Sequence, residues 1–408
     1  QNCNRHPDGR QSGIHRQIHT VEGISVLALL MITMSHKRII WIILILSLCL
    51  NSISCTPMVR YARKTARSYE IRVKLRTVKL PLQVSGKKLL ITDKISGQPI
   101  IDAKKNKQII IIQNGSSTMI NDKRIDSPVE IISEKDEPIY INDRCYFGTI
   151  RIIPGLNPLI INIVPIETYL MSVVSSEMPT SFEVNALAAQ AIIARTYSYY
   201  FMLKNVEEAF DVDDTTAYQV YNGFAQLCGD HSAARKLFRV IASTQSIIAC
   251  YEDKPIIAYF HANSGGRTKS GLSYFGPKSD FPYLIAHDDP YSVDQPGYSW
   301  TYTMQRSDFD KIFSHNCDIV PTDDGQQSIR VGSTTFAPKQ VRAKIGYGKV
   351  KSETYTIDLS DDNVTFTGLG YGHGVGMSQW GANAMAKQKH SFVEIIRFYY
   401  PGVVLDKF

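Results

Sequence analysis

The sequence lacks arginine-rich runs, CxxC pairs and internal repeats, and these absences exclude several classes of protein. It has no arginine-rich run and no alternation of basic and aromatic residues, so nothing in it favours nucleic-acid binding. Its seven cysteines include no CxxC pair, and an odd number of them follows the first 54 residues, which gives no disulfide framework, although one or two bridges stay open. No internal repeat is visible. These absences leave a globular protein whose chemistry has to be inferred from local motifs.

The first 54 residues read as a targeting segment. We expect 1–33 to be untranslated or disordered, because this segment has little globular character. Residues 34–54 follow the order of a signal sequence or membrane anchor, with a basic start, a twelve-residue apolar core at 39–50 and a small-residue site. That core is short for a membrane span. Cys55 follows directly, so cleavage, lipidation of Cys55 and an uncleaved anchor all stay open, and a linker over 55–68 leads to the folded part.

The remaining residues, about 350, suffice for one large or two smaller folded units. Segment 69–163 holds short aliphatic and β-branched runs such as KQIIIIQN and GTIRII, separated by Gly, Asn, Asp and Pro, which predicts a β-rich N-terminal part. Helical patterns and strand-like runs are mixed over 164–408, although 277–361 is polar with few clear periods, and DDPYSVDQPG at 288–297 indicates an exposed loop. The predicted fold class is therefore α+β.

Glu177 occupies the break between two apolar helical patterns. The first pattern runs to Val174, and Pro179 prevents its continuation, so Glu177 lies at or near a helix C-terminus. The partial negative charge of a helix end disfavours an ionised carboxylate, and burial against Met178 and Phe182 acts in the same direction. We therefore expect Glu177 to stay protonated near neutral pH and to donate a proton to a leaving group.

The second helical pattern is predicted to start with a capping box, TSFE at 180–183, and to continue to Met202. Arg195 lies well inside this Ala-rich pattern, where a buried guanidinium needs a partner because it cannot be neutralised. Glu177 or an anionic group of a substrate is the natural candidate. The alternative is that Arg195 extends to solvent and that Glu177 is merely a carboxylate at a helix end.

Glycine recurs at every second position of GLGYGHGVG, 368–376, around His373. Glycine permits positive φ and leaves backbone N–H groups unshielded, so the segment is expected to grip a ligand or to pack tightly against another segment. A nucleotide-binding loop is excluded, because no GK[ST] follows and only about thirty residues remain. A helical pattern starts at about Ser378. A lone histidine such as His373 is more often structural than catalytic.

Several ordered blocks of this sequence resemble the SpoIID/LytB family of bacterial cell-wall proteins. The matching blocks are YLMSVVSSEMP with ALAAQAIIARTY (169–197), TTAYQVYNG (215–223), HANSGGRT (261–268), GHGVGMSQWGANAMA (372–386) and IIRFYYPGV (395–403). They span some 240 residues in the family's order, which makes chance similarity implausible.

The resemblance implies a lytic transglycosylase that cleaves peptidoglycan glycan strands and forms 1,6-anhydro-muramic ends. The preferred strands would be those whose stem peptides an amidase has removed. It also implies that Glu177 is the catalytic acid and that Arg195 and Tyr197 belong to the active site. A transglycosylase can use one carboxylate where a conventional glycosidase needs two, because the sugar's own 6-hydroxyl attacks the anomeric carbon. The family also allows a non-catalytic glycan-binding protein that enhances a cell-wall amidase, but the retained EMP acid, Glu177, and the ARTY arginine, Arg195, favour the enzyme.

Further site residues follow from the resemblance. Arg195 and Tyr197 lie two apart and therefore point to nearly opposite sides of a helix, so we expect Arg195 near the acid and Tyr197 on another wall of the cleft. Some members carry a Cys/His zinc site around the second block, but 211–222 contains neither residue, so we predict no metal and no cofactor. The expected substrate-binding residues are Gln190, Ser264, Gly265, Gly266, His373, Gly374, Ser378 and Gln379.

Two weaker candidates complete the set. Ser264 lacks the G-x-S-x-G elbow, and no acid is placed to orient His261 or His373, so a tight turn that lines the sugar cleft is favoured over a serine nucleophile. The acidic run from Asp211 to Asp214 either supplies a second carboxylate for hydrolysis or is a solvated turn.

Localisation and partners follow from the same resemblance. We expect an exported protein of the periplasm or cell envelope that acts in septal or cell-wall remodelling, with glycan strands and a cell-wall amidase as partners. Any membrane contact would be through the N-terminal segment or a lipid on Cys55. Formal net charge is +7 for the whole chain and +4 after residue 54, which is compatible with an anionic wall.

Overall fold

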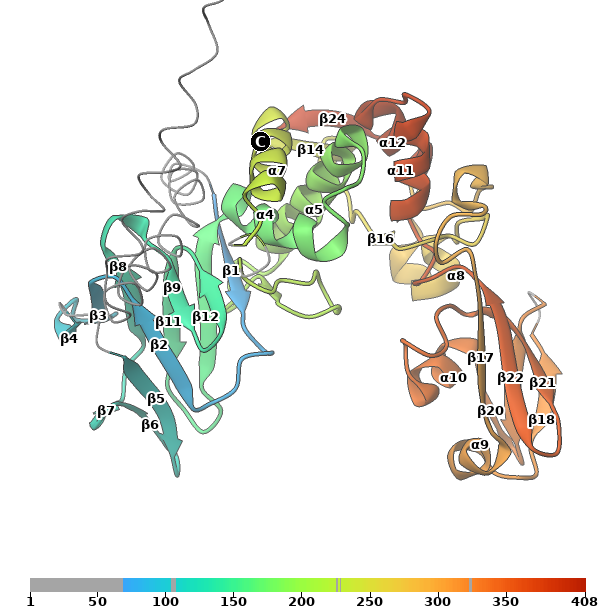
Figure 1. Ribbon diagram of the computed structural model, residues 1–408, viewed down its shortest axis with the longest axis horizontal. Coiled ribbons are helices and arrows are strands. Elements are labelled where there is room, and N and C mark those ends of the chain that lie inside the picture. Colours follow the sequence, from blue (N-terminus) through green and yellow to red (C-terminus); the bar gives the residue numbers. More distant parts are fainter. Residues whose placement is uncertain (1–68, 104–107, 225–226, 228, 323–324) are drawn as a thin grey trace, which may run out of the picture. The chain divides into compact units, whose positions relative to one another are not determined.

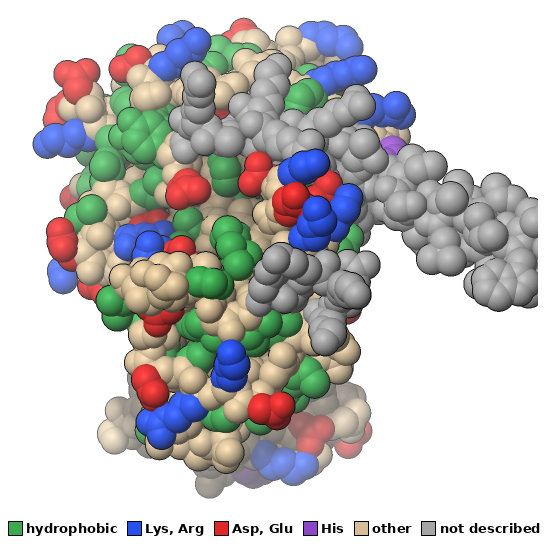
Figure 2. Space-filling view, turned by 90° about the vertical axis from the view of Figure 1, so that its left-hand side faces the viewer, with side chains coloured by type: hydrophobic (Ala, Val, Ile, Leu, Met, Phe, Trp, Pro, Cys, Tyr) green, Lys and Arg blue, Asp and Glu red, His purple; other side chains and the backbone are tan. Residues whose placement is uncertain are grey.

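The computed structural model describes residues 69–103, 108–224, 227, 229–322 and 325–408 (Figure 1). The expectations for 1–33, 34–54 and 55–68 lie outside these residues. Within the described part of the chain, no helix combines the length and the apolar character needed to cross a membrane. Lys and Arg side chains are interspersed with Asp and Glu side chains on the face shown in Figure 2.

The β-rich part predicted over 69–163 is confirmed. Its strands are β1 (Glu70–Lys74), β2 (Leu82–Gly86), β3 (Leu89–Asp93), β4 (Pro99–Ala103), β5 (Ile109–Asn114), β6 (Ser117–Ile120), β7 (Lys123–Ile125), β8 (Val129–Ser133), β9 (Ile139–Ile141), β10 (Arg144–Tyr146), β11 (Thr149–Ile153) and β12 (Leu159–Pro165). With the short β13 (Val212–Asp213), they form a seven-stranded sheet in the order β13-β1-β12-β11-β8-β3-β4 and a six-stranded sheet in the order β10-β9-β2-β5-β6-β7. Alternate residues of the strands, such as Ile71 and Val73, are fully buried, as the period of a strand requires.

Three helices then carry the first part of the site. The chain passes directly from β12 into α4 (Ile166–Glu177), and α5 (Val184–Lys204) and α7 (His231–Ser243) pack beside α4 (Figure 1). Residues 186–198 of α5 are all buried, because α5 is also covered by two later helices and by β14 (Ile247–Tyr251). A helix that is apolar on all sides is typical of a domain core. β14 pairs with β15 (Lys254–Pro255) and with the C-terminal β24 (Val404–Lys407).

The predicted capping box at 180–183 is wrong. Helix α5 starts at Val184, and the N-cap residue Glu183 makes no capping hydrogen bond through its side chain. The preceding residues instead form a turn closed by the N–H of Phe182 on the carbonyl of Pro179. The backbone N–H of Glu183 donates to Oδ1 of Asn383 at 2.9 Å, so a distant helix provides the acceptor that a capping side chain would have provided.

The later motifs contribute a short parallel strand pair and two helices that pack on α5. β16 (Phe260–His261) pairs in parallel with β23 (Met377–Ser378), and α8 (Gly271–Phe275) follows β16 in the chain. Helices α11 (Gln379–Lys387) and α12 (Phe392–Tyr399) both contact α5. The helix expected from about Ser378 is confirmed, with Ser378 as its N-cap: the Ser378 Oγ accepts the N–H of Gly381 at 3.2 Å.

Residues 299–369 contain regular structure that the sequence did not reveal. The elements are β17 (Ser299–Gln305), α9 (Arg306–Phe313), β18 (Asp318–Pro321), β19 (Gln327–Val331), β20 (Thr334–Phe336), α10 (Pro338–Ile345), β21 (Thr354–Leu359) and β22 (Asn363–Leu369). They form two three-stranded sheets around a core of their own that includes Trp300, Phe309 and Phe366. The polar appearance of this segment is explained by strands that bury only one face.

Candidate active site around Glu177

Glu177 is the last residue of α4, as predicted. Its partly buried carboxylate accepts one hydrogen bond through Oε1, from the backbone N–H of Val220 at 2.7 Å. Burial raises the pKa of Glu177 to about 7, and the Val220 N–H opposes this shift only in part. The predicted direction of the shift is confirmed. A carboxyl group with this pKa is present both protonated and ionised near neutral pH.

Val220 belongs to the TTAYQVYNG block, which Gln219 anchors. The fully buried Gln219 accepts hydrogen bonds from the hydroxyls of Tyr169 at 3.1 Å and Ser198 at 3.0 Å, and its amide donates to the carbonyl of Ala194 at 3.3 Å. These bonds fix the loop that presents the Val220 N–H to Glu177. Sequence reasoning missed both residues, because a backbone donor has no side-chain signature and a single glutamine is a weak one.

The prediction that Arg195 pairs with Glu177 is wrong. Arg195 binds Glu167 instead, with Nε on Oε1 at 2.9 Å and Nη2 on Oε2 at 2.7 Å, and both side chains are almost completely buried. The Arg195 Nη1 also donates to the carbonyl of Ile247 in β14 at 3.1 Å. Since Glu167 lies ten residues before Glu177, the pair lies about 15 Å along α4 from the acid. Arg195 therefore ties α4, α5 and β14 together.

Tyr197 makes its contacts elsewhere, as expected for a residue two positions from Arg195. Its buried ring lies 4.8 Å from the ring of Phe201 and 6.0 Å from that of Tyr259, measured between centroids. Tyr259 lies in turn 5.9 Å from the ring of His373. This chain of rings connects the ARTY block of α5 with the glycine-rich segment near the C-terminus.

Gln190 is fully buried, and neither Oε1 nor Nε2 of its amide has a hydrogen-bond partner among the described residues. It precedes Tyr197 by two helical turns and thus lies on the same side of α5. An unpaired buried amide costs about 1–3 kcal/mol. The Nε2 of Gln379 is likewise buried and without a partner in the described chain. Buried polar groups without partners are uncommon in folded proteins, and here two of them belong to predicted substrate-binding residues.

His373 lies among aromatic rings. Its centroid is 5.6 Å from each of the rings of Tyr274, Phe275 and His261, and its Nδ1 accepts the N–H of Val375 at 3.0 Å. Burial holds the pKa of His373 well below the usual value and lowers that of His261 to about 4. Both rings are therefore neutral at pH 7, which fits hydrogen bonding or packing rather than proton transfer.

Comparison with known proteins supports the family. A family model described as SpoIID, stage II sporulation protein, matches residues 157–251. Stage II sporulation protein D of Bacillus subtilis (strain 168) is 32% identical over 262 residues, which cover 60% of this chain and 75% of that protein. An uncharacterised protein of Brachyspira hyodysenteriae is 32% identical over 350 residues, which cover 82% of this chain and 92% of that protein. The chain belongs to the SpoIID/LytB family.

A third relative extends this assignment. The amidase enhancer of Bacillus subtilis is 26% identical over 302 residues, which cover 59% of this chain and 40% of that protein. The names of these relatives associate them with sporulation and with the enhancement of an amidase, which supports a cell-wall remodelling role for the SpoIID/LytB family. The identification made from the ordered blocks is confirmed.

The third and closing SpoIID/LytB blocks converge on Asp289, a completely buried carboxylate. It accepts hydrogen bonds from Ser264 Oγ at 2.8 Å, from Ser292 Oγ, and from the hydroxyl of Tyr399 at 3.1 Å. Ser292 Oγ lies 2.8 Å from Ser378 Oγ. The predicted exposed loop at 288–297 is therefore wrong for Asp289 and Ser292, which are buried because polar partners from three blocks surround them. The substrate-binding roles of Ser264 and Ser378 stay predictions.

The glycine-rich segment 368–376 packs closely against the turn at 264–266. Tight packing against another segment was one of the two alternatives that the sequence predicted. Gly265 has φ of +72°, and a Cβ added there would lie 2.7 Å from the backbone nitrogen of Gly370. A Cβ on Gly376, with φ of +72°, would lie 2.0 Å from the carbonyl oxygen of Tyr259. Larger residues would separate the two segments. Gly266 and Gly374 also have positive φ, and ligand contact by these glycines stays a prediction.

The acidic run is neither a solvated turn nor a free second carboxylate. Asp211, Asp213 and Asp214 are all 2% exposed. Asp211 pairs with Arg72 at 2.5 Å and Asp213 with Arg76 at 2.6 Å, and Asp214 accepts hydrogen bonds at the end of β1, from the N–H of Arg76 at 2.8 Å among others. These contacts attach the segment after α5 to β1.

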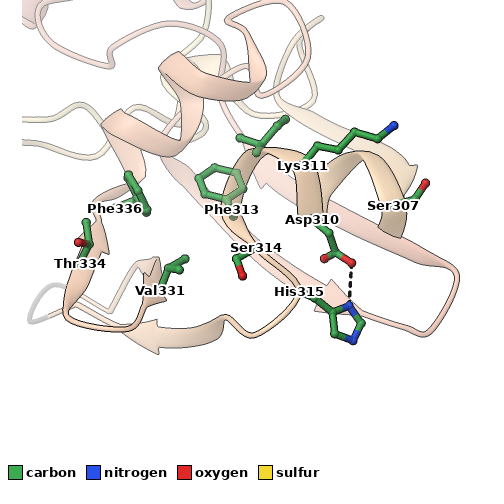
Figure 3. Close-up of a pocket in the computed structure, with 10 residues that line it drawn as sticks. Ser307, Asp310, Lys311, Phe313, Ser314, His315, Val331, Thr334 and Phe336 are labelled. Atoms are coloured by element: carbon green, nitrogen blue, oxygen red, sulfur yellow. Dashed lines mark hydrogen bonds and ion pairs between the residues drawn. The ribbon is translucent and has the colours of Figure 1, made fainter.

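The remaining features lie away from the predicted site. A cavity of about 720 Å³ between α9 and the β19–β20 hairpin is lined by Phe313, His315 and Phe336, among others, and contains none of the predicted site residues (Figure 3). Asp310 and His315 are hydrogen-bonded there at 2.7 Å. Among the described residues, no group of three or more His, Cys, Asp or Glu is placed to hold a metal ion.

Proposed function

We propose that this protein is an exported lytic transglycosylase that cleaves peptidoglycan glycan strands, preferentially strands freed of stem peptides, in septal or cell-wall remodelling. The observation that carries the proposal is Glu177, a helix-terminal carboxyl group with a pKa of about 7, held by one backbone N–H. Membership of the SpoIID/LytB family supports the substrate class. The periplasm or cell envelope is the corresponding location.

One carboxyl group suffices for this reaction. Protonated Glu177 gives its proton to the glycosidic oxygen, and the bond from that oxygen to the anomeric carbon breaks. The resulting carboxylate then takes the proton of the sugar's 6-hydroxyl as its oxygen bonds to the anomeric carbon, which closes the 1,6-anhydro ring. The acid is regenerated and no water is consumed. Asp211 and Asp213 are engaged in ion pairs with Arg72 and Arg76, and Asp214 accepts the backbone N–H of Arg76, so none of the three is a free second carboxylate.

Other residues receive distinct roles in this proposal. Gln190 and Tyr197 lie on one side of α5, and the ring of Tyr259 connects Tyr197 with His373 of the glycine-rich segment. In this proposal Gln190, Tyr197 and His373 would contact the sugar rings or position them. Gln379, the adjacent Gly265 and Gly266, and Gly374 of the glycine-rich segment would make further contacts with the glycan strand. Arg195 acts indirectly, because its bonds to Glu167 and Ile247 hold α4, whose end carries Glu177.

Mass spectrometry of soluble products tests the proposal. Purified protein is incubated with amidase-treated peptidoglycan, in parallel with Glu177→Gln and with the matched control Glu183→Gln, an exposed glutamate six residues further on. We expect anhydro-muramic ends from the parent and from Glu183→Gln and none from Glu177→Gln. Reducing ends would instead indicate hydrolysis and contradict the transglycosylase.

The amidase enhancer relative favours a second candidate, a glycan-binding protein that stimulates a cell-wall amidase. This function predicts that glycan binding and amidase stimulation survive Glu177→Gln. An absence of cleavage products, with binding and stimulation intact in both proteins, would select this candidate.

A further inference from the structure

A groove beside α7 is lined by three cations and by no carboxylate of the described chain. It encloses about 520 Å³, and its polar lining consists of Ser232, Arg235, Lys236, Arg239 and Ser243. These positions recur every three or four residues, so they share one side of the helix. They extend over about 16 Å of helix, which suits an elongated ligand.

Two of the cations have no counter-charge. Arg235 and Arg239 are exposed, and neither has an ion-pair partner among the described residues. Because they are four residues apart, their like charges repel each other on the same helical face. A bound anion would remove this repulsion, and the planar guanidinium group matches a carboxylate in a two-point hydrogen bond.

Lys236 holds the groove against the short segment that follows Glu177. Its Nζ donates to the carbonyls of Thr180 at 2.8 Å and Phe182 at 2.5 Å, both in the connection between α4 and α5. Glu177 precedes this connection, and Val184, which also lines the groove, follows it. Seven residues of extended chain span at most about 25 Å. The groove therefore lies within the length of a short oligosaccharide from Glu177.

We infer that this groove binds the carboxylate of a peptide-free muramic residue on the glycan strand, and that Arg235 and Arg239 select such strands for cleavage. The inference rests on the proposed function. Hydrolysis of the amide bond to the stem peptide leaves a carboxylate beside the sugar ring, whereas an intact strand has a neutral amide there. Two unpaired guanidinium groups distinguish these chemical groups by charge and by hydrogen-bond geometry.

Binding measurements on the full chain carrying Glu177→Gln test the inference, because this background prevents cleavage. The probes are peptide-free glycan strands and the same strands with their carboxyl groups converted to amides. The test variant adds Arg235→Gln and Arg239→Gln. A charge-matched control adds Lys79→Gln and Lys87→Gln, two exposed lysines of the β-rich part.

We expect the Glu177→Gln parent and the lysine control to bind carboxylate strands about three- to tenfold more tightly than amidated strands, the range expected of two partly exposed ion pairs. The arginine variant should bind both strands equally and weakly, and Arg235→Lys with Arg239→Lys should regain most of the preference. Added salt should reduce the difference. Thermal unfolding of each variant shows whether it is folded.

Undiminished preference in the arginine variant would overturn the inference and leave the proposed function intact, provided that the enzyme with Glu177 still forms anhydro ends. Tighter binding of poly(glycerol phosphate) than of glycan, lost in the arginine variant, would also overturn it and assign the groove to a phosphodiester polymer. Neither glycan binding nor anhydro products would refute both proposals together.

Discussion

The first and last turns of α4 each carry a glutamate, Glu167 and Glu177, and the two side chains differ in their partners. Glu167 is buried against Arg195 with two hydrogen bonds and also accepts the N–H of Ser246 at 3.0 Å. Among the described residues, Glu177 has one hydrogen-bond donor, the backbone N–H of Val220, and burial raises its pKa to about 7. A buried carboxylate whose charge is fully compensated forms a structural ion pair, whereas partial compensation raises the pKa and favours the protonated form. The partners, rather than the residue type or the helix, decide the role.

Replacing Glu177 should have the largest effect on activity. Glu177→Gln keeps the shape and the acceptor for Val220 but cannot donate a proton as an acid, so the rate of anhydro-end formation should fall by about 10² to 10⁴. Stability at pH 7 should not fall, because no buried charge is left unpaired. Product rates and urea unfolding curves measure the two quantities. A variant that keeps more than a tenth of the parent rate would remove Glu177 from the chemistry.

Replacing Glu167 should have the largest effect on stability. Glu167→Gln leaves the buried Arg195 without a counter-charge, which should lower the free energy of unfolding by about 3–5 kcal/mol. The exposed control Glu183→Gln should change it by less than about 0.5 kcal/mol.

A double variant sharpens this test. Glu167→Leu with Arg195→Met removes both charges and should recover much of the lost stability, because apolar groups of similar volume can replace a buried pair. Recovery of anhydro-end formation in the folded double variant would establish that Arg195 positions α4. Stability regained without activity would show instead that Arg195 acts directly on the substrate.

The pH dependence of stability should show a smaller effect, which comes from Glu177. Because burial raises the pKa of Glu177 from an ordinary 4.5 to about 7, folding favours the protonated form, and this contribution is lost as pH rises from about 4.5 to 7. The free energy of unfolding should fall by up to about 3 kcal/mol over this window. The fall is measured as the difference between parent and Glu177→Gln. The value of kcat/KM should decline above pH 7, and a rise there would contradict an acid role.

Asp289 is a third buried carboxylate, and the groups that donate hydrogen bonds to it are hydroxyls. Asp289→Asn places an amide donor against Ser264, Ser292 and Tyr399, and it should cost about 1–3 kcal/mol of unfolding free energy. The exposed Asp294→Asn in the same loop is the matched control. Equal stabilities of the two variants in urea would show that this network does not hold the blocks together.

Local signals were sufficient for several features of the site. Pro179 placed Glu177 at a helix end, and the alternating glycines indicated the close backbone approach that Gly265 and Gly376 display. Short aliphatic and β-branched runs separated by turn residues revealed the β-rich part. Local signals failed at Arg195 because a buried guanidinium group shows that it needs a partner but not which one. Its partner Glu167 lies on the same helix as Glu177, the residue that was expected. They failed at Asp289 because its donors come from positions up to 110 residues away.

The sequence by itself determined the family, the α+β class and the position of Glu177 at the end of α4, because ordered motifs, periodicity and a proline act over short distances. Only the tertiary structure decided which charge pairs with which, and how residues 299–369 build their own core. There, Thr-rich β17 pairs with β22 some sixty residues later, which gathers Trp300 and Phe366 in that core. Pairing and burial depend on neighbours that are distant in sequence, and their desolvation set the pKa of Glu177 and the structural role of Arg195.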